Sequence, residues 1–443
     1  MYDKVRTLEA KLSLEPGEIP PNEEKYKVRT IGEPLSLENQ PIEGPNGPAA
    51  VKETPWKRPD DHECGFEILD DFQRFNHCNT IYSRATCDPR IRSDKATNWF
   101  KGQFSQDVAI RDVEGFRQKD IGLRNAGWVG FHQGAQRSQH LDRHDGFLDD
   151  IMEFRPPAKS KVPVESPADM AAEIKQCARV FGADLVGISA YDERWTFTHK
   201  ISPTTLKQRP IEIPAELKNV VVMAFEMPRQ LIRTVPSALS GTATGFGYSR
   251  DMMTLSTLAQ FIRNLGYQAI ASLNDTGGDI PYALQAGLGE YGRHGLLITK
   301  EFGPRVRIGK IFTDLPLAHD KPIHFGVNEF CNVCRKCSNA CPPQAIPDGE
   351  PQTKIINQSN FVGIRKWSVD AEKCFKFWVN QGTDCTICIR VCPYNKDFSK
   401  WYFRIGRWLA GTSLRRLILW LDTKLGFDKR KTPDWWWKKR PGW

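Results

Sequence analysis

Eight cysteines in the C-terminal third of the chain form two runs whose spacing suits iron–sulfur chemistry. The first run is Cys331-x2-Cys334-x2-Cys337-x3-Cys341-Pro, and the second is Cys374-x10-Cys385-x2-Cys388-x3-Cys392-Pro. A [4Fe–4S] cubane takes four thiolates, and in two-cluster ferredoxins the fourth cysteine of each run, followed by proline, binds the other cluster. The spacing therefore predicts one cluster on Cys331, Cys334, Cys337 and Cys392, and another on Cys341, Cys374, Cys385 and Cys388.

Zinc and disulfides are the alternative uses of closely spaced cysteines. Zinc favours isolated cysteine pairs, often with histidine, and neither run contains a histidine. Disulfides persist in oxidising compartments, and the other four cysteines are scattered: Cys64, Cys78, Cys87 and Cys177. We interpret these four as packing residues. The ten-residue step in the second run departs from the simple ferredoxin repeat and brings aromatic residues close to a cluster.

The length and composition of the chain place these runs inside a larger globular protein. A chain of 443 residues is too long for a ferredoxin alone and predicts two or three structural units. No run of about 18 apolar residues is present, so no membrane span is expected. The first residues show neither a secretory nor a twin-arginine signal. We therefore expect a cytoplasmic protein, or an exported, membrane-associated one if a signal was removed.

The positive charge is concentrated in the last 43 residues. Residues 401–443 hold eleven Lys and Arg against three Asp and Glu, and seven of the thirteen Trp. The remainder is nearly neutral, which argues against a nucleic-acid partner. The tail also holds an apolar stripe: Leu414, Leu417, Ile418, Leu421 and Leu425. This pattern suits a helix that lies on an anionic membrane or a partner, or one that packs on the protein's own core.

Helix and strand patterns precede the cysteine runs and must position them. Ser166-Pro167 with Asp169 predicts a helix that begins at Ser166 and ends at Gly182. A second helix is expected over 254–265. Apolar strands are expected over 185–188, 220–225, 269–273, 296–299 and 308–312. This alternation predicts a layered α/β or α+β domain. Residues 1–60 read as an irregular arm, and 61–160 show no clear period.

Several further segments resemble the reductive dehalogenases, which are corrinoid iron–sulfur enzymes that remove halogen from organohalides. Besides both cysteine runs, the resemblance rests on residues 79–85, 182–187, 191–195, 274–277, 285–290, 292–298 and 302–305. It implies an α+β fold with an N-terminal cap (61–165), a nitroreductase-like cobalamin-binding core (166–325), a ferredoxin-like two-cluster unit (326–400) and the basic tail (401–443). The cobalamin would be bound base-off, without a protein ligand to cobalt. The partners would be an organohalide, a low-potential electron donor and, through the tail, a membrane surface or a small membrane-anchor protein.

The resemblance also implies roles for single residues. The reaction R–X + 2e⁻ + H⁺ → R–H + X⁻ needs a proton donor, and Tyr248 matches that position. Arg307 matches a cation that lowers the pKa of the phenol, and Asn274 matches a polar partner. Thr244 and Trp378 match pocket positions, and Arg293 would hold a corrinoid side chain or pair with Glu290. Trp99 and Trp128 are candidates for the cap, or ordinary core aromatics.

Two other functions are compatible with the cysteine runs. Epoxyqueuosine reductase shares cobalamin and two clusters, but it acts on tRNA, uses an aspartate where Tyr248 stands, and usually carries C-terminal helical repeats. This sequence has Tyr248 in place of that aspartate, and it shows no helical repeats. A non-catalytic iron–sulfur electron carrier would not require the roughly 250 residues of additional domain.

Overall fold

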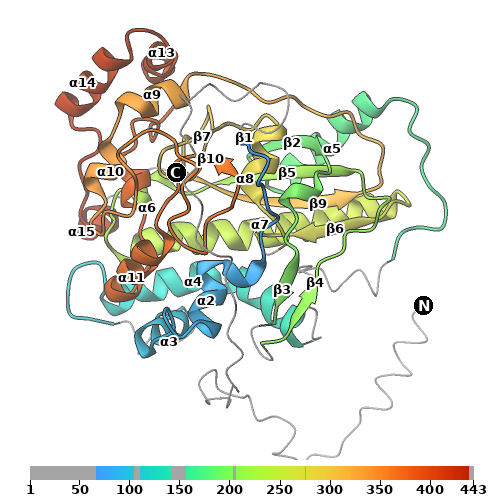
Figure 1. Ribbon diagram of the computed structural model, residues 1–443, viewed down its shortest axis with the longest axis horizontal. Coiled ribbons are helices and arrows are strands. Elements are labelled where there is room, and N and C mark those ends of the chain that lie inside the picture. The colour runs from blue at the N-terminus through green and yellow to red at the C-terminus, as the bar shows by residue number, and fades with distance from the viewer. Residues whose placement is uncertain (1–65, 104–109, 141–155, 203–205, 275, 439–443) are drawn as a thin grey trace, which may run out of the picture. The chain divides into compact units, whose positions relative to one another are not determined.

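The computed structural model describes residues 66–103, 110–140, 156–202, 206–274 and 276–438, with only the backbone over 135–140 (Figure 1). All of these residues lie in the unit that extends from Gly44 to Trp443. The irregular arm expected over 1–60 lies outside the described ranges. In the part of the chain that the structure describes, no helix is long and apolar enough to cross a bilayer.

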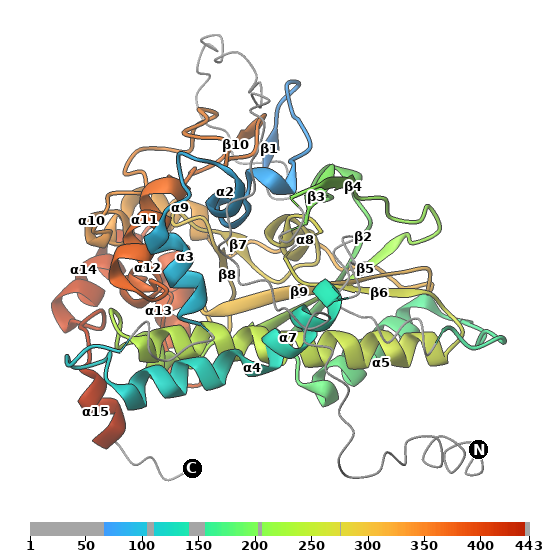
Figure 2. The ribbon, with the colours of Figure 1, turned by 90° about the horizontal axis from the view of Figure 1, so that it is seen from below.

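A four-stranded antiparallel sheet forms the centre of this unit (Figures 1 and 2). Its strand order is β2 (Leu185–Ala190), β5 (Asn219–Glu226), β9 (Val306–Thr313) and β6 (Ala269–Ser272). In the register of the three longest strands, Val222 of β5 lies between Gly187 and Lys310. The strands expected over 185–188, 220–225, 269–273 and 308–312 are therefore confirmed. The strand expected over 296–299 is shorter and forms a hairpin, β7 (Glu290–Tyr291) with β8 (Leu297–Ile298).

The central strand β5 is apolar without interruption because both faces of the sheet are buried. Alternate side chains of a strand point to opposite faces. Val221, Met223 and Phe225 pack with α5 (Pro167–Phe181) and α7 (Ala238–Asn264) in one core cluster. Val220, Val222 and Ala224 pack with α8 (Asp279–Gln285) in another cluster, which also contains three cysteines of the predicted first cluster site. The sheet thus connects the two regions where chemistry was predicted.

Helix α5 forms as its sequence predicts. The Ser166 hydroxyl accepts a hydrogen bond from the Asp169 N–H at 3.2 Å, Pro167 occupies the first turn, and Gly182 ends the helix with φ of 119°. Only glycine adopts that left-handed conformation without strain.

Helix α7 corrects the sequence-based expectation. The predicted helix over 254–265 is the C-terminal half of a helix that already begins at Ala238. The first half contains three glycines and several Ser and Thr residues, which are weak helix formers. Packing explains why it forms: α4 (Gln118–His140) runs alongside it (Figure 2). A Cβ at Gly245 would lie 2.4 Å from the Trp128 ring, so the glycine allows the two helices to approach.

The two cysteine runs lie on short helices and the loops that follow them. These are α9 (Val327–Val333), α10 (Lys336–Ala340), α11 (Ala371–Gln381) and α12 (Ile387–Val391). The long step of the second run is the C-terminal part of α11 and the turn at Gly382. The tail continues as α13 (Trp401–Ala410), α14 (Arg415–Leu425) and α15 (Pro433–Lys438).

The remaining elements are short. In the N-terminal region they are β1 (Glu67–Ile68), η1 (His77–Asn79), α2 (Ile81–Cys87) and α3 (Asp94–Lys101). Further along the chain they are η3 (Glu193–Trp195), β3 (His199–Ile201), β4 (Gln208–Pro210), α6 (Arg229–Ile232) and β10 (Ile364–Arg365). Strand β1 pairs antiparallel with β10, which connects the N-terminal region to the cysteine unit.

Candidate active site and cluster-binding unit

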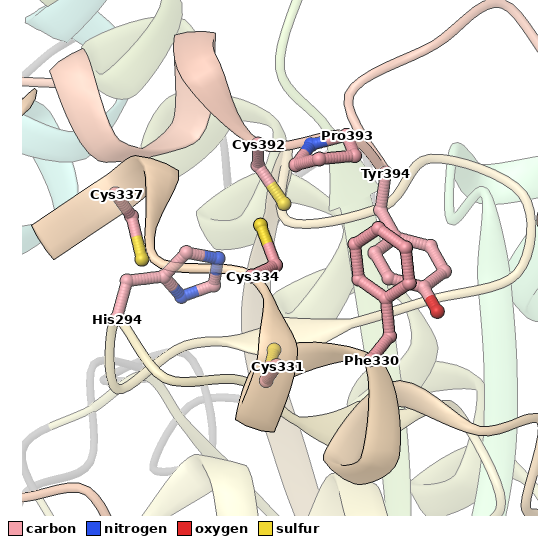
Figure 3. A pocket seen from close by; sticks show the side chains of 8 residues that line it. All are labelled: His294, Phe330, Cys331, Cys334, Cys337, Cys392, Pro393 and Tyr394. Carbon is pink, nitrogen blue, oxygen red and sulfur yellow. The ribbon is translucent and has the colours of Figure 1, made fainter. Parts of the chain in front are cut away.

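The structure brings together the four cysteines predicted to hold the first cluster. Cys331, Cys334 and Cys337 from the first run and Cys392 from the second line one pocket (Figure 3). The other residues that line it are His294, Phe330, Pro393 and Tyr394. The crossover of Cys392 follows from the turn after α12, which delivers the cysteine at the helix C-cap to the loops of the other run.

The second predicted set, Cys341, Cys374, Cys385 and Cys388, gathers in a neighbouring apolar cluster together with Cys337. Cys388 interacts electrostatically with the other three members of its set and with Cys337. The two sets are therefore adjacent, as serial electron transfer requires. Burial raises the pKa of Cys385 to about 11 and that of Cys374 to about 12, so these thiols have an apolar environment.

The donor set fits iron–sulfur clusters. Peptide N–H groups hydrogen-bond to four of the cysteine sulfurs, and for Cys331, Cys334 and Cys392 these bonds lower the pKa in opposition to burial. The donors are Arg293 for Cys331, Lys336 for Cys334, Tyr394 for Cys392, and Ala345 for Cys341. Hydrogen bonds to the sulfurs are one of the means by which proteins stabilise such clusters and tune their potentials.

Arg293 lies at the first cysteine run. Its guanidinium donates to the carbonyl oxygen of Cys331 at 2.8 and 3.1 Å, and to those of Pro347 and Gly349 at 2.9 and 2.7 Å. The proposed pairing with Glu290 is wrong, because that carboxylate accepts the N–H groups of Phe325 and Val327 instead. With its donors directed to these carbonyls, Arg293 braces the cluster loop, and nothing in the structure supports its assignment to a corrinoid side chain.

Tyr248 lies on the N-terminal half of α7, which was not predicted from the sequence. Its hydroxyl accepts a hydrogen bond from Asn274 Nδ2 at 2.9 Å, and Asn274 itself is exposed at the end of β6. The ring stacks on Trp128 with centroids 5.2 Å apart, and the guanidinium carbon of Arg307 lies 3.9 Å from the ring centroid. Thr244 lies one turn earlier on α7 and therefore on the same side as Tyr248.

The protonation of Tyr248 reflects opposing influences. Burial raises the pKa of the phenol above its usual value of 10, and the charges of Asp279 and Asp251 act in the same direction. The Arg307 cation and the Asn274 hydrogen bond lower the pKa, but burial prevails. The phenol therefore keeps its proton at neutral pH.

Aromatic side chains from the N-terminal region and the cysteine unit meet beside this tyrosine. The rings of Trp99 and Trp378 lie 6.1 Å apart, and Tyr82 of α2 lies 6.2 Å from both. Tyr82 also interacts electrostatically with Tyr248 and Arg307. Sequence reasoning missed Tyr82, although it falls within the segment 79–85 that carries part of the resemblance.

Tyr82 is partly accessible, and two nitrogen atoms beside Tyr248 are buried without hydrogen-bond partners in the described residues. Protein surrounds Tyr82 closely enough that burial raises its pKa well above the usual value, yet 37% of its surface is accessible. Within the described ranges, Trp128 Nε1 and Arg307 Nε are buried without hydrogen-bond partners. An unpaired buried donor costs about 1–3 kcal/mol, which a polar ligand would offset.

These observations define a class of protein, an α+β protein that carries a two-cluster cysteine unit and a separate tyrosine site. Two family models match the chain: "4Fe-4S double cluster binding domain" over residues 330–395 and "Reductive dehalogenase subunit" over residues 205–317. The ferredoxin-like unit is therefore confirmed. The first match contains all eight cysteines of the two runs, and the second contains Tyr248, Asn274 and Arg307.

Curated and solved relatives agree with these models. A tetrachloroethene reductive dehalogenase from Desulfitobacterium hafniense is 40% identical over 52% of this chain and 49% of its own length. Another, from Sulfurospirillum multivorans, is 36% identical over 61% of this chain and 59% of its own length. A catabolic reductive dehalogenase solved in complex with 3-bromo-4-hydroxybenzoic acid aligns with a TM-score of 0.65 at 25% identity, over 83% of this chain and 49% of that one. The resemblance to reductive dehalogenases is thus confirmed, and the chain spans about half the length of the relatives it matches.

Proposed function

We propose that this chain is an oxidoreductase that removes halide from an organohalide, with two [4Fe–4S] clusters and a base-off corrinoid. The observation that carries the proposal is the group formed by Tyr248, Asn274 and Arg307, which combines a protonated phenol, a hydrogen-bond donor to its oxygen and a cation over its ring. The similarity to reductive dehalogenases supports the choice of reaction.

In the balanced reaction R–X + 2e⁻ + H⁺ → R–H + X⁻, the proton would come from Tyr248 Oη. The bound corrinoid would supply low-valent cobalt, the reductant for the carbon–halogen bond. Asn274 orients the phenol oxygen and stabilises the phenolate after proton transfer, and Arg307 balances its negative charge. Trp378, Tyr82 and Thr244 would line the pocket and exclude water, which strengthens these electrostatic interactions.

The two cysteine sets support an order of electron transfer. Cys374 of the second set is among the groups that influence Tyr82, so this set lies toward the tyrosine site. The pocket of the first set lies next to a second cavity of about 260 Å³, which α13 and α14 border. Phe330, Pro393 and Tyr394 line both. Electrons from a low-potential donor would therefore enter at the first cluster and leave from the second.

The test is anaerobic reconstitution of the chain with iron, sulfide and hydroxocobalamin, followed by halide release with a reduced viologen as donor. The two test substrates are tetrachloroethene and a bromophenol, which represent the halogenated compounds named for the relatives. Equimolar halide and dehalogenated product are expected with at least one of them. A protein fully loaded with iron and cobalt that releases halide from no member of a wider panel would contradict the proposal.

The finer architecture forms part of the same proposal. Residues 166–325 would form a nitroreductase-like core, and residues 61–165 would cap its pocket with Tyr82, Trp99 and Trp128. Support for the cap comes from α2, whose Tyr82 contacts Trp378 of the cysteine unit, and from α4, whose Trp128 stacks on Tyr248.

We further propose that the tail binds an anionic membrane surface. Helix α13 exposes a row of apolar side chains, with Trp401 65% and Trp408 69% accessible, and α14 exposes several more. Cations interleave with them, since Arg404 and Lys424 are also exposed. The combination of aromatic and basic residues on a helix face suits the interface of anionic lipids. In contrast, Trp437 packs against the protein and donates to Asp120 at 2.6 Å.

Flotation with phosphatidylglycerol and phosphatidylcholine vesicles tests this surface. The chain should float with the anionic vesicles, and the double variant W401S/W408S should not. M253S is the matched control, because Met253 is 63% accessible on a different helix, α7. Failure of the unaltered chain to bind anionic vesicles would refute the membrane proposal and favour a protein partner for this face.

A further inference from the structure

The tip of the β7–β8 hairpin carries a histidine to the first cysteine set. The five-residue loop 292–296 is closed by hydrogen bonds from Gly292 N to Leu296 O at 3.0 Å and from Gly295 N to Gly292 O at 2.9 Å. Gly295 has φ of 77°, which favours glycine. His294 lies in the middle of this tight loop, so its backbone position is fixed.

The imidazole of His294 has one ring nitrogen paired and one unpaired. The N–H of Leu296 donates to Nδ1 at 3.3 Å, so Nδ1 is the acceptor and the ring proton resides on Nε2. The side chain is only 5% accessible, and Nε2 has no hydrogen-bond partner in the described part of the chain. A buried N–H without an acceptor is unfavourable, so this nitrogen is expected to face a ligand.

Cysteine sulfur atoms line the pocket that contains the His294 ring. Figure 3 shows the His294 ring among the cysteine side chains, close to Cys337 and Cys334. The side chains of Phe330 and Pro393 have no acceptor atom, and the Tyr394 hydroxyl points away from the sulfurs (Figure 3). Iron–sulfur clusters accept hydrogen bonds at both their sulfide and their cysteine sulfurs.

We propose that His294 Nε2–H donates a hydrogen bond to a sulfur of the first cluster and raises the reduction potential of that cluster. The inference rests on the proposed cluster ligation, but not on the dehalogenase activity. Reduction adds a negative charge to the cluster, and an N–H directed at its sulfur stabilises the reduced form more than the oxidised form. His294 is thus a positioning residue that would help the first cluster to accept electrons.

The test is a redox titration, followed by electron paramagnetic resonance, of the reconstituted full chain and two variants. H294L removes the donor, and H294Q returns an amide N–H near the position of Nε2. H319Q is the matched control, because His319 bonds to Asn219 through its own Nε2 at 2.7 Å, outside both cysteine sets. Iron content is measured on every sample, so that loss of a cluster is distinguished from a change in its potential.

We expect one of the two midpoint potentials to fall in H294L, and the other to remain as in the unaltered chain. About a tenfold decrease in the ratio of reduced to oxidised cluster at fixed potential corresponds to about 59 mV for one electron. H294Q should recover most of this shift, and H319Q should show none. Unchanged potentials in H294L, or a fall in H294Q as large as in H294L, would overturn the inference.

A second measurement covers the case in which H294L loses the cluster. Electron–nuclear double resonance on the reduced, unaltered chain labelled with ¹⁵N-histidine should detect a ¹⁵N coupling that is absent in H294Q, where the restored amide N–H carries no histidine label. If the unaltered chain lacks this coupling, His294 does not contact the cluster. A chain that takes up no iron refutes the cluster assignment itself, and this inference with it.

Discussion

Removal of the Tyr248 hydroxyl separates the chemical role of this residue from its packing role. In Y248F the ring retains its neighbours, Trp128 and Phe131 at 5.2 Å and the Arg307 guanidinium at 3.9 Å. The variant loses one hydrogen bond, worth about 0.5–1.5 kcal/mol. Asn274 is exposed in the chain without a bound corrinoid, so in that form water replaces the lost acceptor and no buried polar group is left unpaired.

The expected effect on catalysis is much larger than the effect on stability. A positioned general acid contributes about 10²- to 10⁴-fold to the rate. At about 1.4 kcal/mol for each tenfold change, that is roughly 3–5 kcal/mol of activation free energy. Halide release by Y248F, assayed anaerobically on protein with full iron and cobalt loading, should therefore fall by two orders of magnitude or more, while the thermal unfolding midpoint changes by only a few degrees.

Y267F provides the matched control. Tyr267 is also buried, and its hydroxyl donates to the carbonyl oxygen of Val162 at 2.8 Å, in the core packed on α5 and α7. Y267F should lose similar stability but keep its halide release rate. The reasoning is refuted if Y248F releases halide within about twofold of the unaltered rate, or if Y267F is equally impaired.

Three further substitutions probe separate parts of the account. R307M removes the cation that lowers the Tyr248 pKa, so the pKa should rise further: the rate should fall, and the alkaline limb of its pH profile should move to higher pH. C392A should lower the iron content from about eight to about four per chain through loss of the first cluster, whereas C177A should leave it unchanged. Burial lowers the pKa of Lys366 to about 8, so the unfolded chain binds an extra proton between about pH 8 and 10.5, and stability should rise with pH there. K366M should lack that dependence in thermal unfolding measured from pH 7 to 10, and should be more stable than the unaltered chain at pH 7.

Some features could be predicted from the sequence because their determinants are local. Both cysteine sets follow from spacing, since three cysteines of a run must share one loop and the fourth must reach the other run. Helix α5 was predictable for a similar reason, because its cap, its first-turn proline and its terminal glycine are consecutive signals.

Other features depend on contacts between distant segments. The first half of α7 is a weak helix by composition and forms because α4 packs against it, so the helical setting of Tyr248 could not be predicted from the sequence. Tyr82 joins the site from a helix more than 160 residues before Tyr248. The partners of Arg293 are carbonyl oxygens of the cysteine unit, and a sequence pattern does not reveal backbone acceptors.

The metal content of the reconstituted protein tests the central claim most directly. The chain should be purified anaerobically after expression or refolding with hydroxocobalamin, and iron and cobalt should be measured per chain. Two four-iron clusters and one corrinoid predict about eight iron and one cobalt. About eight iron without cobalt would contradict the corrinoid-dependent reductase and leave an iron–sulfur electron carrier.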